Sequence, residues 1–399
     1  MRHTYSRRTV VSAGAAAALA IPFGVGRLSA FAQESTPIAE GLPALPPGCT
    51  VVASGLFNPR YVAVDADGTL YISEAGDAGD EQVLEPVGEG TPAASAAVLT
   101  TRGTTGQVTK VAPDGTQSVL AAGLPSYSFG TEVVGPAGIA ISNGLIYLAI
   151  GGPGPATVVV DPVVNQDSVV SIDPATGIVT PVSDIGGYER SQNPEPSAID
   201  SNLYGLAAGA DGTLYVADAG GNTVYKIDPT TGEFSVLAVL EMLDFNGAPI
   251  NPVPTGVTVG ADGNIYVGLL SGAPFPAGGA KVLQITPDGT VSDALTNLTM
   301  VVDVEFSPDG ELYASEISEN FLVQPPANGL VLKGNADGTN TIVVPDLFLA
   351  NGIAFDAEGN LYVVVNTSAP AGSPPSGMVL KCAVTMGAST PVAMATPQP

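Results

Sequence analysis

Histidine is almost missing from this 399-residue chain, and tryptophan is missing altogether. The one histidine is His3, close to the N-terminus. If the segment that carries His3 is removed, no Ser-His-Asp triad, histidine base or histidine metal site remains. Any catalysis by the rest of the chain would then depend on carboxylates, tyrosine, lysine or a hard metal ion.

Basic residues are also scarce, with 12 Lys and Arg against 38 Asp and Glu and a net charge of −26. Four of the twelve lie in residues 1–32, and every acidic residue lies after them, so residues 33–399 carry eight basic and 38 acidic residues. This balance argues against nucleic acid or anionic lipid as a partner and favours solubility and cation binding. An acidic bias is equally common in exported proteins, so the charge alone does not select a function.

The first 32 residues have the pattern of a cleaved export signal. A basic start, Met1–Arg8, precedes an apolar run, Val10–Val25, and the small residues of Ser29–Ala32 resemble a cleavage site. The arginine pair Arg7-Arg8 predicts a Tat-like signal, although Val10 stands where that motif usually has Phe, so the general secretory route stays open. The apolar run is shorter than the ~20 residues that span a bilayer. We therefore expect an extracytoplasmic protein, secreted, periplasmic or envelope-associated, with no stable membrane insertion after cleavage.

Two further segments have too little apolar content to order themselves. Residues 33–48 and 387–399 are rich in Pro, Ala, Ser and Thr, and they are predicted to be a disordered linker and a disordered C-terminal tail. The folded domain is therefore expected to occupy residues 49–386.

One short phrase recurs six times: a polar residue, Gly, any residue, an apolar residue and Tyr. The six copies end at Tyr71, Tyr147, Tyr215, Tyr266, Tyr313 and Tyr362. An Asp-Gly or Asn-Gly pair between apolar runs supplies the positive backbone dihedrals of a tight hairpin turn. The glycines are 76, 68, 51, 47 and 49 residues apart, close to the period of propeller blades, with insertions in the first two intervals. Each phrase is therefore interpreted as the first hairpin of one blade.

These repeats predict an all-β fold, a six-bladed β-propeller with four strands in each blade. The last blade lacks its fourth strand, whereas Thr50–Ser54 is a strand with no hairpin before it, so the N-terminal strand should complete the last blade. Cys49 opens that strand and Cys382 ends the third strand of the last blade. In an exported protein, this placement predicts a Cys49–Cys382 disulfide, with two buried free thiols as the alternative.

Several segments resemble the ScyD/ScyE family of exported propellers, which is related to NHL-repeat and SMP-30-type rings. They include Gly55–Arg60, Ser201–Gly205, Val216–Asn222 and Leu269–Gly278, and the resemblance extends over nearly all of Cys49–Ala383. The chain departs from the family at Leu203 and Ala273, where Pro and Phe are usual. The resemblance implies an extracytoplasmic role without a settled reaction.

Candidate functional residues lie on the loops that open around the central channel of a propeller, where binding groups normally gather. The candidate ligand-binding residues are Asn58, Arg60, Asn202, Asp218, Phe275 and Asn366. Carboxylate and amide oxygens suit Ca²⁺, and SMP-30-like rings hold a divalent ion in a comparable place. The candidate metal ligands are Glu74, Asn202, Asp303, Glu316 and Asn351, and Glu74 and Asp303 are also the candidate catalytic residues.

Structural interpretations compete with these roles. Asp218 resembles the aspartate of NHL-type blades, which holds loop backbone. Arg60 could serve only to neutralise Glu74 and Glu316. Phe275 could cover the channel mouth, or could form an aromatic pocket together with Tyr127 and Phe129.

Three functions remain open. The first is a non-catalytic exported platform that binds a small molecule or a protein on its channel face. The second is a Ca²⁺-dependent lactonase or hydrolase resembling the SMP-30 group, with Glu74 or Asp303 as the base. The third is a purely structural envelope protein.

Overall fold

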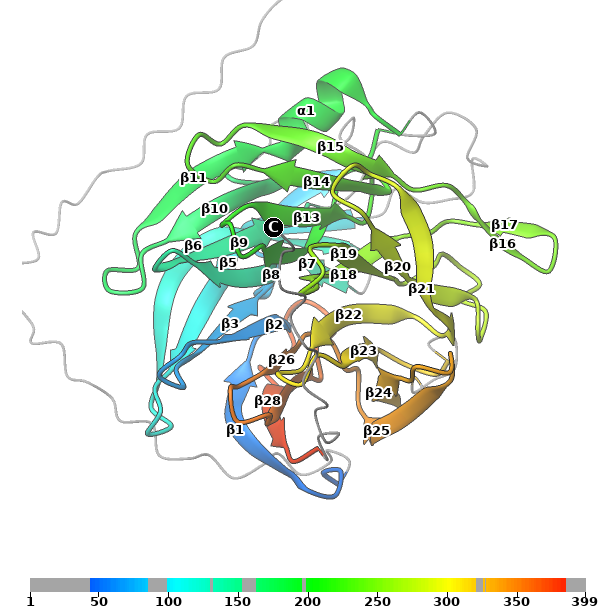
Figure 1. Ribbon diagram of the computed structural model, residues 1–399. Helices are drawn as coiled ribbons and strands as arrows, with labels where there is room; N and C mark the ends of the chain where they lie inside the picture. The colour runs from blue at the N-terminus through cyan, green and yellow to red at the C-terminus, as the bar shows by residue number, and fades with distance from the viewer. Residues whose placement is uncertain are drawn as a thin grey trace, which may run out of the picture. The chain divides into compact units, whose positions relative to one another are not determined.

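The computed structural model describes residues 44–84, 99–129, 132–152, 163–195, 199–320, 326 and 328–384. The predicted export signal (1–32), most of the predicted linker and the predicted tail (387–399) lie outside these residues. Within them, six antiparallel sheets are arranged around a common centre as the blades of a β-propeller (Figure 1). The prediction of an all-β, six-bladed fold is confirmed.

Each blade has four main strands, ordered from the centre outward. Blade 1 has β2 (Pro59–Val64), β3 (Leu70–Glu74), β5 (Leu99–Val111) and β6 (Gln117–Phe129), and blade 2 has β8 (Pro136–Ser142), β9 (Leu145–Ile150), β10 (Ser168–Ile172) and β11 (Val179–Asp184). Blade 3 has β12 (Leu203–Ala208), β13 (Leu214–Asp218), β14 (Thr223–Ile227) and β15 (Phe234–Val239), and blade 4 has β18 (Pro254–Val259), β19 (Ile265–Leu269), β20 (Ala280–Ile285) and β21 (Val291–Leu298). Blade 5 has β22 (Val301–Phe306), β23 (Leu312–Glu316), β24 (Gly329–Gly334) and β25 (Asn340–Leu347), and blade 6 has β26 (Ile353–Phe355), β27 (Leu361–Val365), β28 (Gly377–Cys382) and β1 (Cys49–Leu56).

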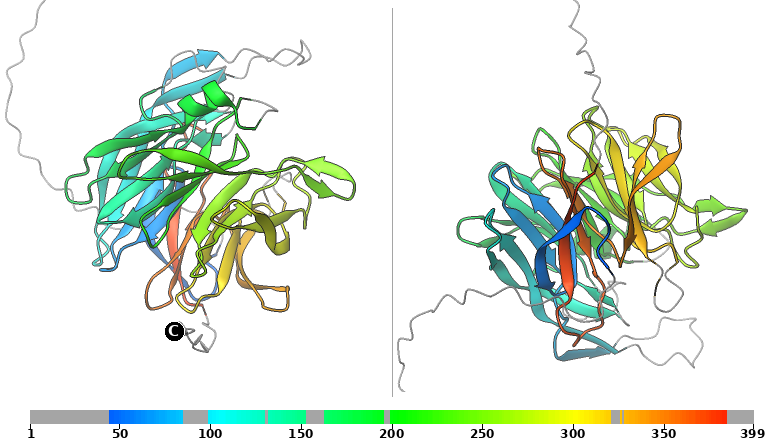
Figure 2. Two further views of the ribbon diagram at one scale, coloured as in Figure 1. Left: turned by 45° about the horizontal axis from the view of Figure 1, so that its top comes forward. Right: turned by 90° about the horizontal axis from the view of Figure 1, so that it is seen from below.

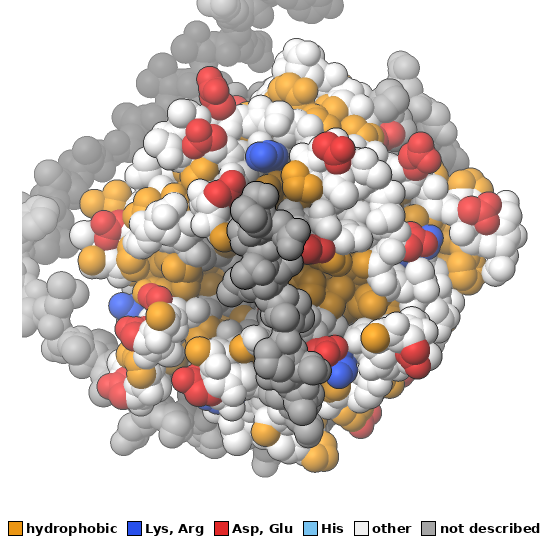
Figure 3. Space-filling view, in the orientation of Figure 1, with side chains coloured by type: hydrophobic (Ala, Val, Ile, Leu, Met, Phe, Trp, Pro, Cys, Tyr) orange, Lys and Arg blue, Asp and Glu red, His pale blue; other side chains and the backbone are white. Residues whose placement is uncertain are grey.

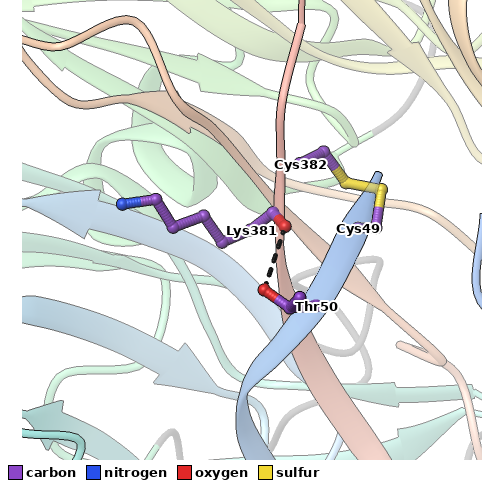
Figure 4. The surroundings of a disulfide bond; sticks show 4 residues. All are labelled: Cys49, Thr50, Lys381 and Cys382. Carbon is purple, nitrogen blue, oxygen red and sulfur yellow. Dashed lines mark hydrogen bonds between the residues drawn. A yellow bond between two sulfur atoms is a disulfide. The ribbon is translucent and has the colours of Figure 1, made fainter. Parts of the chain in front are cut away.

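The N-terminal strand closes the ring, as predicted. Strand β1 pairs antiparallel with β28, and Cys49 lies opposite Cys382 in this register. The two cysteines form a disulfide, and the neighbouring Thr50 hydroxyl donates a hydrogen bond to the Lys381 carbonyl (Figure 4). The alternative of two free thiols is therefore wrong. The disulfide joins residues 333 positions apart and connects the two ends of the ring.

The recurring Tyr phrase forms both a turn and a contact between blades. In the first copy, Gly68 has φ +85° and the Asp67 carboxylate accepts a hydrogen bond from the Thr69 N–H at 2.9 Å, which stabilises the turn. The tyrosine of the phrase contacts the next blade. In the fourth copy, the ring of Tyr266 in blade 4 meets Phe306 of blade 5 edge to face, with ring centroids 5.0 Å apart. The repeat thus encodes the hairpin and helps to fix its neighbour.

Glycines in the innermost strands allow the blades to meet closely at the centre. A Cβ placed on Gly205 would lie 2.1 Å from the Thr255 carbonyl oxygen, and one on Gly256 would lie 2.4 Å from the Asp303 Cα. Such distances are far inside van der Waals contact, so a side chain at either position would push neighbouring blades apart.

Four elements were not anticipated from the repeats. They are the helix α1 (Ile185–Gln192), the strand β4 (Glu81–Leu84), which pairs with an extension of β5, the short β7 (Glu132–Val134), and the hairpin of β16 (Leu243–Phe245) and β17 (Ala248–Ile250). The β16–β17 hairpin projects outward from the rim of the ring (Figure 2). Among the described residues, no helix has the length and apolar character needed to cross a membrane.

The acidic composition is visible on the surface. On the face shown in Figure 3, acidic side chains are spread around the ring, basic ones are few, and hydrophobic side chains gather towards the centre.

Candidate binding site at the channel face

The centre of the ring is marked by two departures from the glycine pattern of the innermost strands. In each innermost strand, an apolar residue pairs with the second strand of the same blade, and the residue before it can be compared between blades. That residue is glycine in blades 2, 3, 4 and 6, but it is Tyr61 in blade 1 and Asp303 in blade 5. Both side chains reach another blade. The Tyr61 hydroxyl donates a 2.9 Å hydrogen bond to the Val302 carbonyl, and Asp303 Oδ2 accepts a 2.7 Å hydrogen bond from the Ile353 N–H. Each exception therefore links its blade to another by a side-chain hydrogen bond.

Two tyrosine rings meet at this centre. Tyr61 and Tyr204 are in edge-to-face contact, with ring centroids 5.7 Å apart and an angle of 71° between the ring planes. Burial raises the pKa of Tyr61 well above its usual value, and the nearby Asp303 raises it further. Burial likewise raises the pKa of Tyr204. Both hydroxyls are therefore neutral at physiological pH and serve as hydrogen-bonding groups.

Asn351 is the polar side chain with an unmet hydrogen bond at this centre. Its Nδ2 donates to the Tyr204 hydroxyl at 2.7 Å, and its side chain is completely buried. Its Oδ1 has no hydrogen-bond partner in the part of the chain that the structure describes. Turning the amide over would only exchange the two atoms, so one of them stays unpaired in either orientation. An unpaired buried polar atom costs about 1 to 3 kcal/mol, which a ligand group could recover.

An apolar cluster lies beside the tyrosines. Its buried members are Met300, Val302, Ile317 and Leu349, with Leu270, Phe275 and Phe348 packed against them. Val302 connects the cluster to the centre because its carbonyl accepts the Tyr61 hydroxyl. Of the other two residues in the predicted aromatic pocket, Tyr127 donates its hydroxyl to Gln166, and the Phe129 side chain lies outside the description, so that pocket stays a prediction.

Arg60 is 2% exposed and braces the loops around the centre. Its Nη1 donates to the Thr367 carbonyl at 3.0 Å, and its Nη2 donates to the Val133 carbonyl and lies 3.5 Å from Glu132 Oε1. Its ion pair is thus with Glu132, whose side chain is half exposed, and not with Glu74 or Glu316.

Glu74 is fully buried, and its oxygens are hydrogen-bonded within blade 1 and to the loop before it. Oε2 accepts from the Phe57 N–H at 2.7 Å, and Oε1 accepts from Gln107 Nε2 at 2.9 Å and from the Thr109 hydroxyl at 2.5 Å. Burial raises the pKa of Glu74, and the three hydrogen bonds oppose that rise.

Glu316 and Asp303 are also buried, and their carboxylates also accept hydrogen bonds from main-chain N–H groups. Glu316 Oε1 accepts from the Thr299 N–H at 2.8 Å, and burial raises its pKa to about 7. Asp303 Oδ1 accepts from the Val304 N–H at 2.8 Å, and its pKa is raised, mainly by burial.

The three carboxylates among the five predicted metal ligands are not grouped to hold a metal ion. They belong to blades 1 and 5 and accept hydrogen bonds from local donors, whereas a Ca²⁺ site needs oxygens that converge on one point. Within the described ranges, no group of three or more Asp, Glu, His or Cys side chains is placed to hold a metal ion. Asn202, from the same set, has its Oδ1 against Gly151 in blade 2.

The remaining predicted ligand-binding residues hold loops in place. Asn58 Nδ2 donates to the Gly76 carbonyl at 2.9 Å and Asn366 Nδ2 donates to the Ser376 carbonyl at 2.9 Å. Asp218 accepts four hydrogen bonds, from the Ser201 hydroxyl and from the main-chain N–H groups of Asn202, Gly220 and Gly221. Asp218 therefore holds loop backbone, as in the scaffold interpretation.

Sequence reasoning identified Asn351 but missed four other residues with unmet hydrogen bonds or central positions, namely Tyr61, Tyr204, Asp167 and Asp200. An alignment of the innermost strands on their paired apolar residues would have identified Tyr61, because it replaces glycine. Asp167 and Asp200 lie in irregular connections outside the repeated phrase, so no periodic signal marks them.

No known protein family and no curated protein matches this chain by sequence. Solved structures do match its fold. They include a calcium-binding protein, regucalcin, from Agrobacterium tumefaciens, with 12% identity, a TM-score of 0.51 and coverage of 85% of this chain and 94% of that one. A putative oxidoreductase (glucose dehydrogenase) from Thermus thermophilus has 17% identity, a TM-score of 0.49 and coverage of 84% and 98%, and a putative gluconolactonase has 13%, 0.49, 85% and 94%. Identities this low show the propeller fold alone.

Proposed function

We propose that this chain is an exported, non-catalytic β-propeller that binds a small molecule at its channel face. The observation that carries the proposal is the unpaired amide atom of Asn351, which lies beside Tyr204 and close to the apolar cluster that includes Phe275. Tyr204 is half-buried, so a small movement of its side chain would open the amide to a ligand. An apolar body with one amide or hydroxyl group would match these surroundings.

Export and family relationship belong to the same proposal. The Cys49–Cys382 disulfide is typical of proteins that mature in an oxidising compartment, and the N-terminal sequence has the pattern of an export signal. The segments that resemble the ScyD/ScyE family include Gly55–Arg60 and Ser201–Gly205, and these contribute Arg60 and Tyr204 to the centre of the ring.

A Ca²⁺-dependent hydrolase is the second candidate, and the fold shared with regucalcin is the observation that favours it. Its proposed bases, Glu74 and Asp303, are each committed to main-chain donors, which favours the binding platform.

Ligand-observed NMR tests the proposal with a fragment library of neutral compounds, each with one aromatic ring and one amide or hydroxyl. We expect binding by the wild type, loss of binding in Asn351→Ala, and retention in Asn264→Ala, whose amide lies at an exposed turn. Binding that survives Asn351→Ala would contradict the proposal. Lactone hydrolysis with Ca²⁺ that is abolished by Glu74→Gln would establish the hydrolase instead.

A further inference from the structure

A second group of polar side chains lies between blades 2 and 3. It consists of the carboxylates Asp167, Glu189, Asp200 and Asp218, which interact electrostatically with one another. Arg190 is the cation that acts on Asp167, and it also lies 4.0 Å from Asp184. Each of Asp167, Glu189 and Asp200 has its pKa raised by neighbouring carboxylates as well as by burial, and Arg190 offsets this effect at Asp167.

Asp167 is held in one orientation with one oxygen unused. Its side chain is 2% exposed, and Oδ2 accepts a 3.0 Å hydrogen bond from Gln166 Nε2. Gln166 is itself fixed, because its Oε1 accepts the Tyr127 hydroxyl at 2.7 Å. Asp167 Oδ1 has no hydrogen-bond partner anywhere in the described ranges. A carboxylate oxygen that is buried, oriented and unpaired implies a ligand or a proton.

Asp200 presents a second oxygen of the same kind. Its Oδ1 is buried and lacks a hydrogen-bond partner within the described part of the chain. Burial raises its pKa to about 6, with Asp218 as the next cause.

Glycines make room for these oxygens. A Cβ on Gly152 would lie 2.4 Å from both Asp167 oxygens, and one on Gly220 would lie 2.7 Å from Asp200 Oδ1. Next to Gly152, a Cβ on Gly151 would lie 2.2 Å from Asn202 Oδ1, which adds a neutral oxygen. The side-chain oxygens of Asp167, Asp200 and Asn202 thus lie against the backbone of glycine residues.

We propose that a divalent hard cation, Ca²⁺, binds between blades 2 and 3 with Asp167 Oδ1 and Asp200 Oδ1 as its carboxylate ligands. Asn202 Oδ1, main-chain carbonyls and water complete the shell, since Ca²⁺ takes six to eight oxygens of mixed type. Asp218 contributes charge and not a ligand, because its oxygens are already hydrogen-bonded. The described residues contain no group of three or more Asp, Glu, His or Cys side chains placed to hold a metal ion, but the proposed site needs only two carboxylates. The proposed site does not use Asn351, so the inference is independent of the proposed function.

The test uses the folded protein with its disulfide intact, stripped with EDTA and titrated with Ca²⁺ or Mg²⁺ by calorimetry and thermal melting. We expect Ca²⁺ to raise Tm, Mg²⁺ to bind more weakly, and Asp167→Asn or Asp200→Asn to weaken Ca²⁺ binding at least tenfold. Glu305→Gln is the matched control, a half-buried carboxylate in blade 5 whose loss should leave Ca²⁺ affinity unchanged.

A readout without metal separates lost ligation from misfolding. Asp167→Asn keeps an oxygen that can accept the Gln166 hydrogen bond, so its Tm in EDTA should stay close to that of the wild type, and Asp200→Asn provides a second, less buried variant. The proposal is overturned if Ca²⁺ leaves the wild-type Tm unchanged, or if the double variant still binds with wild-type affinity. Loss of binding in Glu316→Gln alone would also overturn it and would point to the channel.

Discussion

The Tyr61 hydroxyl, in the innermost strand of blade 1, donates a 2.9 Å hydrogen bond to the main-chain carbonyl of Val302 in blade 5. Blade 6 lies between these blades in the ring, so the bond bypasses the blade that contains the disulfide. The ring is therefore closed by three kinds of link: the β1–β28 pairing, the disulfide, and polar side chains at the centre.

Removal of the disulfide should destabilise the ring substantially. Replacing Cys49 and Cys382 by Ser frees a loop of more than 300 residues in the unfolded chain, which costs about 6 kcal/mol on the loop-entropy model. Urea unfolding of the double variant measures this loss, and dithiothreitol-reduced wild type is the matched control. A double variant that is as stable as the oxidised wild type would refute the closure role.

The Asp303 bridge between blades 5 and 6 should contribute measurable stability. Asp303→Ala leaves the Ile353 N–H buried without its acceptor, at a cost of about 1 to 3 kcal/mol in the free energy of unfolding. Asp303→Asn keeps one acceptor oxygen and should lose less. Equal losses in the two variants, measured by chemical denaturation, would show that the hydrogen bond does not account for the effect.

A side chain at Gly256 should prevent normal packing of the inner strands. The added Cβ of Gly256→Ala would lie 2.4 Å from the Asp303 Cα, so we expect a loss of more than about 3 kcal/mol or failure to fold. Gly115→Ala is the control, because its φ is +86° but nothing lies within 4 Å of the added atom, and it should cost about 1 kcal/mol. Similar Tm values for the two variants would contradict the close-packing argument.

Stability should rise as the pH falls from 8 to 5 in metal-free buffer. Burial raises the pKa of Glu189, Glu305 and Glu316 from 4.5 to about 7, and that of Asp200 from 3.8 to about 6. These carboxyls bind protons more tightly in the folded state, so stability is greatest below the unfolded pKa and falls as the pH rises to the folded pKa. The urea midpoint should therefore be higher at pH 5 than at pH 8.

Two comparisons check that pH dependence. Glu305→Gln removes one titrating group and should reduce the difference between the two midpoints. Turn aspartates such as Asp67 and Asp211 have lowered pKa values because of hydrogen bonds from nearby threonines, so their contribution is lost only below about pH 4. A midpoint that is lower at pH 5 than at pH 8 would be inconsistent with these buried carboxyls.

The sequence by itself determined the number of blades, their turns and the closure of the ring. These features are local and periodic: each Asp-Gly turn depends on a few adjacent residues, and the strand that lacks a partner identifies Thr50–Ser54 as the closing strand. The pairing of Cys49 with Cys382 followed from the same count of strands.

Only the tertiary structure decided which polar groups have unmet hydrogen bonds. Glu74 and Glu316 have the sequence pattern of ligands, yet their donors come from loops and neighbouring strands that no repeat specifies. Asn351 and Tyr204 meet although 147 positions separate them, and Asp167 and Asp200 come from irregular connections. Burial and hydrogen bonding depend on which distant segments pack together, so the repeat predicted the scaffold but not the unpaired oxygens.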